Sequence, residues 1–317
     1  MKTLFTTDYK NYEPNWPSSS RPSARGIILI DNISDYSTLS PDDKIALAYS
    51  TKHQFYKFPG GIHKGEENTT ALIKNQNLDD YEKDDGFELR IVTLDRAIQT
   101  NLRVKSEDYA KLDMIARETL VMEKLCGVDE NIPRAFAEAL LENGVAKNPG
   151  PWREHSYAVA QAAEKIAKAT QVLNPDFAYT CGLLHDIGRQ MGHTYIAHVY
   201  DGYYFLKNLG YDKLARICLT HSFNLHIIED YIGKIDITDA QYEELKNLLA
   251  ATEYDDYDRL IQLLDSTCGA DGTKNMEARM NDVRQRYGNY QEGKWNKNFE
   301  LKAYFEKMMG RGLYDVI

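Results

Sequence analysis

The sequence has few cysteines for its length, and no two of them lie close together. Cys126, Cys181, Cys218 and Cys268 are widely scattered among 317 residues, and no CxxC pair occurs. Disulfide-rich domains and cysteine zinc sites both need closely spaced or repeated cysteines. We therefore expect four small core side chains in a reducing compartment, without a disulfide framework or a cysteine zinc site.

Long apolar runs and an excess of positive charge are also missing. Residues 1–5 (MKTLF) begin no apolar run long enough for a signal peptide, and no later stretch approaches a membrane span, so we expect a cytoplasmic protein. Lys and Arg number 38 against 48 Asp and Glu, a formal net charge of −10. Nucleic acids and anionic membranes bind positive surfaces, so neither is expected as a stable partner. A small anionic substrate stays possible, because a metal can hold it locally.

The predicted secondary structure changes near residues 128–133. Before this point, residues 26–30 and 44–49 predict β-strands, and after it the strand signals give way to helical patterns. A chain of this length can form two domains. We predict an α+β protein overall, with a small α/β domain at residues 1–128 and an all-α domain at residues 129–317.

A proline-glycine-glycine turn followed by Gly-Glu stands in the first part, at residues 58–67 (FPGGIHKGEE). Together with residues 87–98 and a helix through residues 117–120, it resembles the beginning and end of a Nudix domain. The middle departs from that family, whose box continues into Arg-Glu and then a magnesium-binding Glu-Glu pair. Lys74-Asn75 and Leu78-Asp79 stand at these places. We therefore interpret residues 1–128 as a truncated, degenerate and non-catalytic Nudix-like domain.

The second part contains an apolar segment that ends in a histidine and an aspartate. Asn174-Pro175 predicts the start of a helix, and Gly188 is expected just past its end. The residues between them are mostly apolar, so we expect this helix to be buried. His185 and Asp186 close it, although a buried carboxylate is costly unless it is paired or bound to a cation. The pair therefore suggests a metal site.

Other histidines and a second aspartate occupy similar places. His155 lies one turn before Val159 on the apolar face of a predicted helix, and Asp265 follows the apolar run of residues 260–264. His198 lies on a predicted helix at residues 194–208, and His221 directly follows another at residues 211–220. Imidazole and carboxylate ligands suit Fe, Mn, Zn, Co or Ni better than Mg or Ca. We therefore expect one or two divalent transition-metal ions.

This order of histidines and aspartates resembles the HD superfamily of metal-dependent phosphohydrolases over residues 150–270. The resemblance implies an all-α domain whose first metal is bound by His155, His185, Asp186 and Asp265. It also implies that Asp186 bridges to a second ion, since His198 and His221 lie where two-metal members place their additional histidines. The alternative is that these two histidines are core or rim residues hydrogen-bonded to the backbone. His193 and His226 are interpreted as loop residues.

The predicted ligands define a hydrolytic chemistry with Asp186 at its centre. Metal-bound water is a stronger acid than bulk water, so hydroxide becomes available near neutral pH to attack phosphorus. A cation is also needed to orient the phosphate. Arg189, three residues after Asp186, is the first candidate for this catalytic and substrate-binding role, and Arg153 is a second candidate for substrate binding. The alternative for Arg189 is a charge that complements the helix dipole.

The sequence leaves several functions open. The first is a phosphohydrolase that cleaves a phosphate ester or anhydride of a small phosphorylated metabolite, above all a nucleotide. HD members act on deoxynucleotides, alarmones, dinucleoside polyphosphates and cyclic dinucleotides, and the spacing of His198 and His221 resembles the dinucleoside polyphosphate branch. The second is a non-catalytic, nucleotide-sensing regulator with a structural metal site. The third is hydrolysis by the Nudix-like half, which predicts activity that survives Asp186→Ala but is lost in Glu66→Ala.

Overall fold

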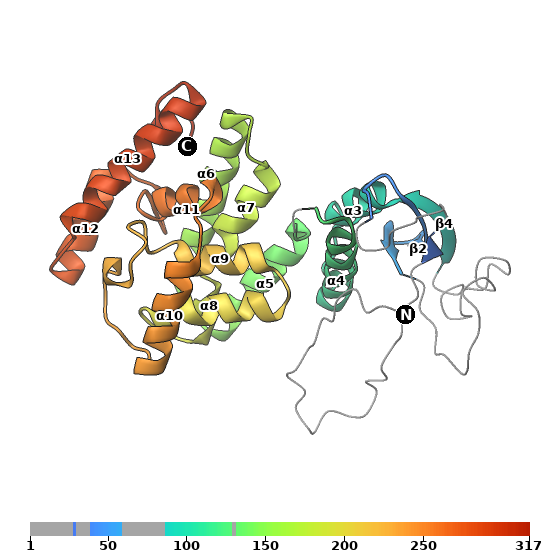
Figure 1. Cartoon of the computed structure of the whole chain (residues 1–317), viewed down its shortest axis with the longest axis horizontal. Coiled ribbons are helices and arrows are strands. Elements are labelled where there is room, and N and C mark those ends of the chain that lie inside the picture. Colours follow the sequence, from blue (N-terminus) through green and yellow to red (C-terminus); the bar gives the residue numbers. More distant parts are fainter. Residues whose placement is uncertain (1–27, 30–38, 59–85, 129–130) are drawn as a thin grey trace. The chain divides into compact units, whose positions relative to one another are not determined.

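The computed structural model describes residues 28–29, 39–58, 86–128 and 131–317 (Figure 1). Its contacts divide the chain into two compact units, residues 1–136 and 137–317. The Nudix-box positions Glu66, Lys74-Asn75 and Leu78-Asp79 lie outside the described residues. The Nudix-like interpretation and the domain boundary at residues 128/129 therefore stay predictions.

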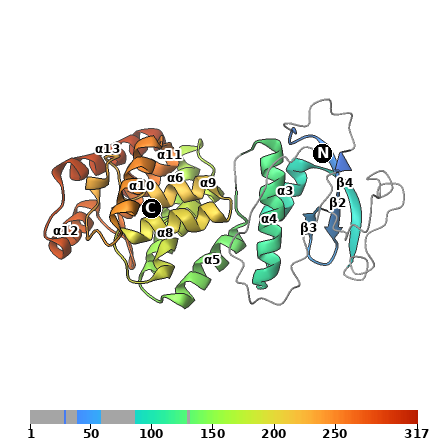
Figure 2. The ribbon, with the colours of Figure 1, turned by 60° about the horizontal axis from the view of Figure 1, so that its bottom comes forward.

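The first unit contains a small antiparallel sheet with β2 (Lys44–Ser50) at its centre. β4 (Phe87–Thr93) pairs with β2 along its whole length, from Lys44 opposite Thr93 to Ser50 opposite Phe87. β1 (Ile28–Leu29) and β3 (Phe55–Lys57) pair with successive parts of β2 (Figure 2). The strand predicted at residues 44–49 is confirmed, and β1 lies within the strand predicted at residues 26–30.

The helices α3 (Leu94–Leu102) and α4 (Tyr109–Cys126) follow the sheet in the described part of the first unit. α3 begins directly after β4, where the Thr93 hydroxyl accepts a hydrogen bond from Arg96 N at 3.3 Å. α4 ends at Gly127, which adopts the left-handed conformation with φ 61°. Apolar residues of the sheet and of both helices form a common core that includes Ile45, Leu47, Leu94, Ile98 and Met122.

Buried polar side chains of the first unit bind backbone groups. Asn101 pairs with both the N–H and the C=O of Tyr56, at 2.7 and 2.8 Å. Glu118 is 4% exposed and accepts a hydrogen bond from Phe58 N at 2.9 Å. These side chains connect the helices to the strand edge, so their polarity serves the fold.

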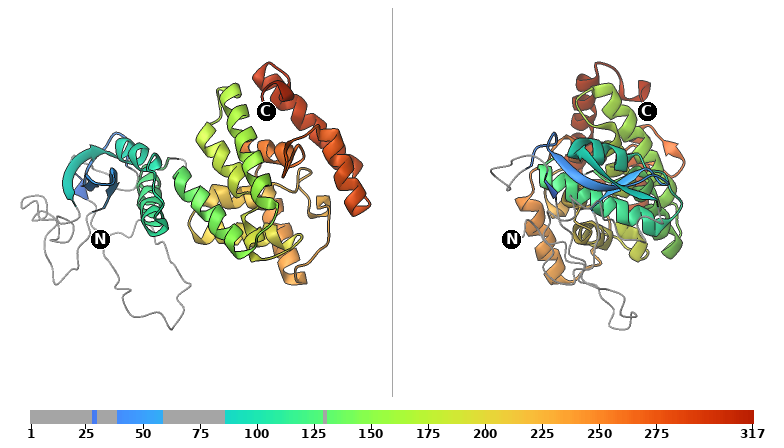
Figure 3. Two further views of the ribbon diagram at one scale, coloured as in Figure 1. Left: turned by 180° about the vertical axis from the view of Figure 1, so that it is seen from behind. Right: turned by 90° about the vertical axis from the view of Figure 1, so that its right-hand side faces the viewer.

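The second unit is built from helices and a short β-hairpin (Figure 3). α6 (Trp152–Thr170) and α7 (Pro175–Leu184) pack closely, because a Cβ on Gly182 would lie 2.7 Å from the Cα of Ala160. The Asn174 side chain accepts hydrogen bonds from the first turn of α7, and Pro175 opens the helix, as predicted. The further helices are α5 (Arg134–Lys147), α8 (Ala197–Asn208), α9 (Asp212–Thr220), α10 (Asp239–Ala251), α11 (Asp256–Asp265), α12 (Met276–Tyr287) and α13 (Glu292–Met309), and the hairpin is β5 (Cys268–Gly269) with β6 (Gly272–Thr273).

α11 lies at the centre of this unit and contacts α6, α7, α9 and α13. It carries Asp265 as its last residue. α10 begins with a capping box, in which Thr238 and Gln241 satisfy each other's backbone N–H groups. The α+β class is consistent with this arrangement of sheet and helices. None of the helices in the described part of the chain combines the length and apolar character that a membrane span needs.

The prediction that Gly188 lies just past the end of a helix is wrong. α7 already ends at Leu184, and Gly188 lies inside a 3₁₀ helix at Ile187–Met191. A Cβ on Gly188 would lie 2.0 Å from His198 O and 2.6 Å from Gly202 N. Glycine is required here because the 3₁₀ helix touches the backbone of α8, so its role is close approach and not helix termination.

Candidate metal centre

Three side chains from different helices meet in a first group: His155, His185 and Asp265. His155 lies in the first turn of α6, His185 directly follows α7, and Asp265 ends α11. The Nε2 atom of His155 lies 3.2 Å from His185 Nε2 and 3.1 Å from Asp265 Oδ1. His185 is fully buried, whereas the Asp265 side chain is 34% exposed, so this group is accessible from the side of Asp265.

A second group consists of Asp186, His198 and His221. His198 lies in the first turn of α8, and His221 directly follows α9. The two histidine Nε2 atoms are 3.2 Å apart and lie 3.1 and 3.6 Å from Asp186 Oδ1. All three residues are buried. Among the described residues, these two groups are the ones in which three potential ligand atoms lie close enough to share an ion.

The two groups are neighbours because His185 and Asp186 are adjacent in the chain. His185 Nε2 lies 3.8 Å from Asp186 Oδ2, and the rings of His185 and His221 are 5.1 Å apart. Asp186 was predicted to bind the first ion and to bridge to a second ion that His198 and His221 would share. Asp186 Oδ1 lies close to those two histidines, while Oδ2 lies 3.8 Å from His185 Nε2 and accepts a hydrogen bond from Arg189.

Hydrogen bonds to the backbone fix the orientation of three imidazole rings. Nδ1 of His185 lies 2.7 Å from Gly182 O, and Nδ1 of His221 lies 2.8 Å from Cys218 O. His198 Nδ1 contacts Tyr195 O in the same way. A carbonyl can only accept, so each Nδ1 must carry the proton, and each neutral ring presents an Nε2 lone pair. Such outer hydrogen bonds are typical of metal-binding histidines.

Burial keeps two of these histidines neutral. It lowers the pKa of His221 to about 3, and the nearby His185 acts in the same direction. Burial also lowers the pKa of His185. Because a metal binds the deprotonated imidazole nitrogen, these rings need not lose a proton near neutral pH before they coordinate an ion.

The two carboxylates are ionised despite their surroundings. Burial opposes the charge of Asp186, but the charge of Arg189 outweighs it and holds the pKa of Asp186 well below its ordinary value. Burial opposes the charge of Asp265 as well, and the interaction with His155 lowers its pKa below the ordinary value. Both carboxylates therefore offer negatively charged oxygens to the space between the histidines.

This donor set fits a cation. The Nε2 atoms of His198 and His221 lie 3.2 Å apart, and when both rings are neutral with the proton on Nδ1, these atoms are two acceptors that cannot hydrogen-bond each other. Asp186 Oδ1 is buried and receives no hydrogen bond from the described residues. Converging acceptors without a donor are costly unless a cation binds them. Imidazole with carboxylate suits a divalent transition metal.

The two predicted arginines have different surroundings. Arg189 donates from Nε to Asp186 Oδ2 at 2.6 Å, and its side chain is 32% exposed. It therefore lies beside the second group with part of its surface open to solvent. Arg153 instead donates to both carboxylate oxygens of Glu142, at 3.0 and 2.6 Å. His193 is an exposed loop residue, and the ring of His226 contacts Leu249 O outside both groups.

Sequence reasoning missed a lysine and an aspartate close to these groups. The Lys294 ammonium lies 3.5 Å from a carboxylate oxygen of the buried Asp230. Burial lowers the pKa of Lys294, whereas the charges of Asp230 and Asp265 partly offset this effect. Lys294 lies on α13, nearly thirty residues beyond Asp265, in a helix whose sequence resembles an ordinary surface helix. No signal in the sequence distinguishes it.

Comparison with known proteins gives one match. Residues 152–269 match the family model of the HD domain, over less than half of the chain. This segment includes all six residues of the two groups. HD domains are generally metal-dependent hydrolases and bind divalent metals. No curated protein and no solved structure matches the chain.

Proposed function

We propose that residues 129–317 form an HD-type metal-dependent phosphohydrolase. Its substrate is a small phosphorylated metabolite, above all a nucleotide, in which it cleaves a phosphate ester or anhydride. The observation that carries this proposal is the pair of adjacent three-residue groups, together with the buried Asp186 Oδ1, which receives no hydrogen bond from the described residues. The family match over the same residues supports it.

Each group is proposed to hold one divalent ion. His155, His185 and Asp265 would hold the first, and Asp186, His198 and His221 the second. Asp186 can also approach the first ion, since its Oδ2 atom is directed towards His185. Four imidazoles favour Fe, Mn, Zn, Co or Ni over magnesium. Such ions supply acidified water and neutralise charge on phosphoryl oxygens.

Arg189 is proposed to orient the phosphoryl group. Its guanidinium is held by Asp186, which aligns it beside the second group, and its exposed part can meet an anionic substrate. Asp265 is the most exposed of the six proposed ligands, so substrate would enter from its side. Arg153 gains no support from the geometry, because its guanidinium is already paired with Glu142. Its substrate-binding role stays a sequence prediction.

Metal analysis and a substrate screen test the proposal together. The purified full chain should contain a transition metal and release phosphate from at least one nucleotide or phosphomonoester. Asp186→Ala should abolish this turnover. Bound metal without turnover on any phosphate would instead support a nucleotide-sensing protein. Activity that survives Asp186→Ala but disappears in Glu66→Ala would locate the chemistry in the first unit, and a protein that binds no added metal would refute both metal-centred functions.

A further inference from the structure

The backbone carbonyls on both sides of His221 are held by side chains from other helices. Gln262 of α11 donates from Nε2 to Thr220 O at 3.0 Å. Lys294 of α13 donates from Nζ to Ser222 O at 2.6 Å. Gln262 is buried, and the Lys294 side chain is 13% exposed. The backbone that presents the His221 ring is therefore fixed from two directions.

α11 holds the end of α9 at a further point. The Thr220 hydroxyl donates to Asp258 Oδ1 at 2.6 Å, and Arg216 Nη2 lies 3.1 Å from Asp258 Oδ2. Asp258 and Gln262 are one turn apart on α11, and Asp265 follows three residues after Gln262. α11, which carries Asp265 of the first group, therefore holds the end of α9, which presents His221 of the second group.

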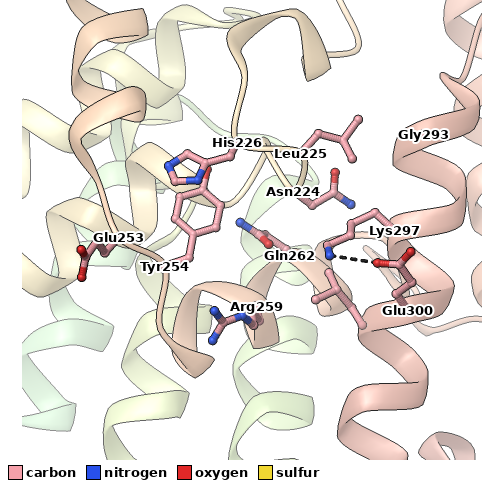
Figure 4. A pocket seen from close by; sticks show the side chains of 11 residues that line it. Asn224, Leu225, His226, Glu253, Tyr254, Arg259, Gln262, Gly293, Lys297 and Glu300 are labelled. Atoms are coloured by element: carbon pink, nitrogen blue, oxygen red, sulfur yellow. Dashed lines mark hydrogen bonds and ion pairs between the residues drawn. The ribbon is translucent and has the colours of Figure 1, made fainter.

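The Gln262 side chain also borders open space. It lines a cavity of about 660 Å³ whose wall includes Asn224, Tyr254, Arg259 and Lys297 (Figure 4). A methionine has nearly the same length and shape as glutamine but lacks the amide donor. Because the cavity leaves room beside the side chain, Gln262→Met removes the hydrogen bond to Thr220 without displacing the surrounding core.

We propose that Gln262 is a positioning residue for the metal centre. By holding Thr220 against α11, it sets the place of His221 relative to Asp186 and His198, and so the affinity of this group for its ion. Lys294 holds the Ser222 carbonyl on the other side of His221 and helps to fix the same ring. The inference rests on the proposed function, in which each group holds an ion. Loss of outer partners of this kind weakens metal binding by about 10- to 100-fold.

Titration of the metal-free full chain with Mn²⁺ tests the assignment. The wild type should bind two ions in a calorimetric titration, and electron paramagnetic resonance should report two coupled ions. Gln262→Met should bind the first ion with unchanged affinity and the second about 10- to 100-fold more weakly. Lys294→Met should change the second affinity in the same direction, which keeps the test decisive if Gln262→Met folds poorly.

A neighbouring core residue provides the matched control. Ile261 is fully buried on α11, and an aliphatic side chain cannot hydrogen-bond Thr220. Ile261→Val should lower the melting temperature slightly and leave both Mn²⁺ affinities unchanged. The positioning role is overturned if Gln262→Met and Lys294→Met bind both ions like the wild type, if Ile261→Val has an equal effect on the second ion, or if the wild type binds a single ion. A wild type that binds no Mn²⁺ or other transition metal would instead refute the proposed function.

Discussion

Two carboxylates in the two units are equally buried but differ in what surrounds them. Glu118 of the first unit and Asp186 of the second are each 4% exposed. Glu118 accepts a hydrogen bond from the backbone N–H of Phe58, the residue that follows β3. Asp186 Oδ1 receives no hydrogen bond from the described residues and faces two imidazole lone pairs. Burial of charge alone therefore does not identify a site; a buried carboxylate oxygen that faces imidazole nitrogens and has no donor does.

The difference predicts separate consequences for removing each carboxylate. Asp186→Asn keeps the shape of the side chain but removes its charge, so turnover should fall by a factor on the order of a thousand or more. Glu118→Ala should leave turnover per folded molecule unchanged, while the orphaned N–H of Phe58 lowers the free energy of unfolding by about 1–3 kcal/mol. Steady-state kinetics and urea denaturation would measure the two effects. If Asp186→Asn retained its turnover, the Asp186 carboxylate would not be required for catalysis.

Two glycines, one in each unit, should also differ in how strongly a substitution affects the protein. Gly188→Ala would push a Cβ into the backbone of α8, so we expect a loss of about 3 kcal/mol or more in unfolding free energy and weaker metal binding. Gly127→Ala in the first unit meets no atom within 4 Å and suffers only from its positive φ, at about 1 kcal/mol. Denaturation of both variants and Mn²⁺ titration of Gly188→Ala would test this. Equal stability losses would contradict the close approach of the 3₁₀ helix to α8.

Low pH should destabilise the metal-free second unit, because its buried histidines bind protons more readily in the unfolded state. The pKa of His221 is about 3 in the folded state and about 6.5 when unfolded, so the unfolded chain binds more protons between these values. Stability of the metal-free protein is therefore lost as pH falls below about 6.5, by about 2 kcal/mol at pH 5 from His221 alone. Urea denaturation in a chelator at pH 7 and pH 5 measures the loss. His221→Asn should show a smaller loss, and an equal one would show that other groups cause it.

A partnered polar group in the second unit should behave like those of the first. Thr238 accepts a hydrogen bond from Gln241 N at the start of α10. Thr238→Ala should lower the unfolding free energy by about 1 kcal/mol and leave metal content and turnover unchanged. Thr238→Ser should restore most of the stability, since its hydroxyl can serve as the same acceptor. A change in metal content would show that α10 influences the site.

Local signals in the sequence predicted local structure well. Asn174-Pro175 begins α7 as predicted, because these residues act on backbone groups within one turn. His185, Asp186 and Asp265 were found because a histidine or aspartate that closes an apolar helix is unusual, whereas the other three proposed ligands were identified from the order of residues that resembles the HD superfamily. Their roles as ligands stay predictions, although the fold brings all six together in two groups.

Properties that depend on contacts between distant segments could not be predicted. The prediction for Gly188 was wrong because its contact with the backbone of α8 leaves no signal in the local sequence. Arg153 stands next to a proposed ligand in the sequence, but the fold places Glu142 against its guanidinium. Lys294 and Gln262 reach the residues beside His221 from other helices, and neither spacing nor composition indicates such partners.

The contacts of the three imidazole rings with the backbone follow one rule of spacing. His185, His198 and His221 each use the carbonyl three residues earlier, at Gly182, Tyr195 and Cys218. Each turn thus selects the tautomer of its own histidine from within a four-residue segment. The direction of each Nε2 atom is therefore set by local backbone contacts. The distances between these atoms depend on how the helices pack against one another.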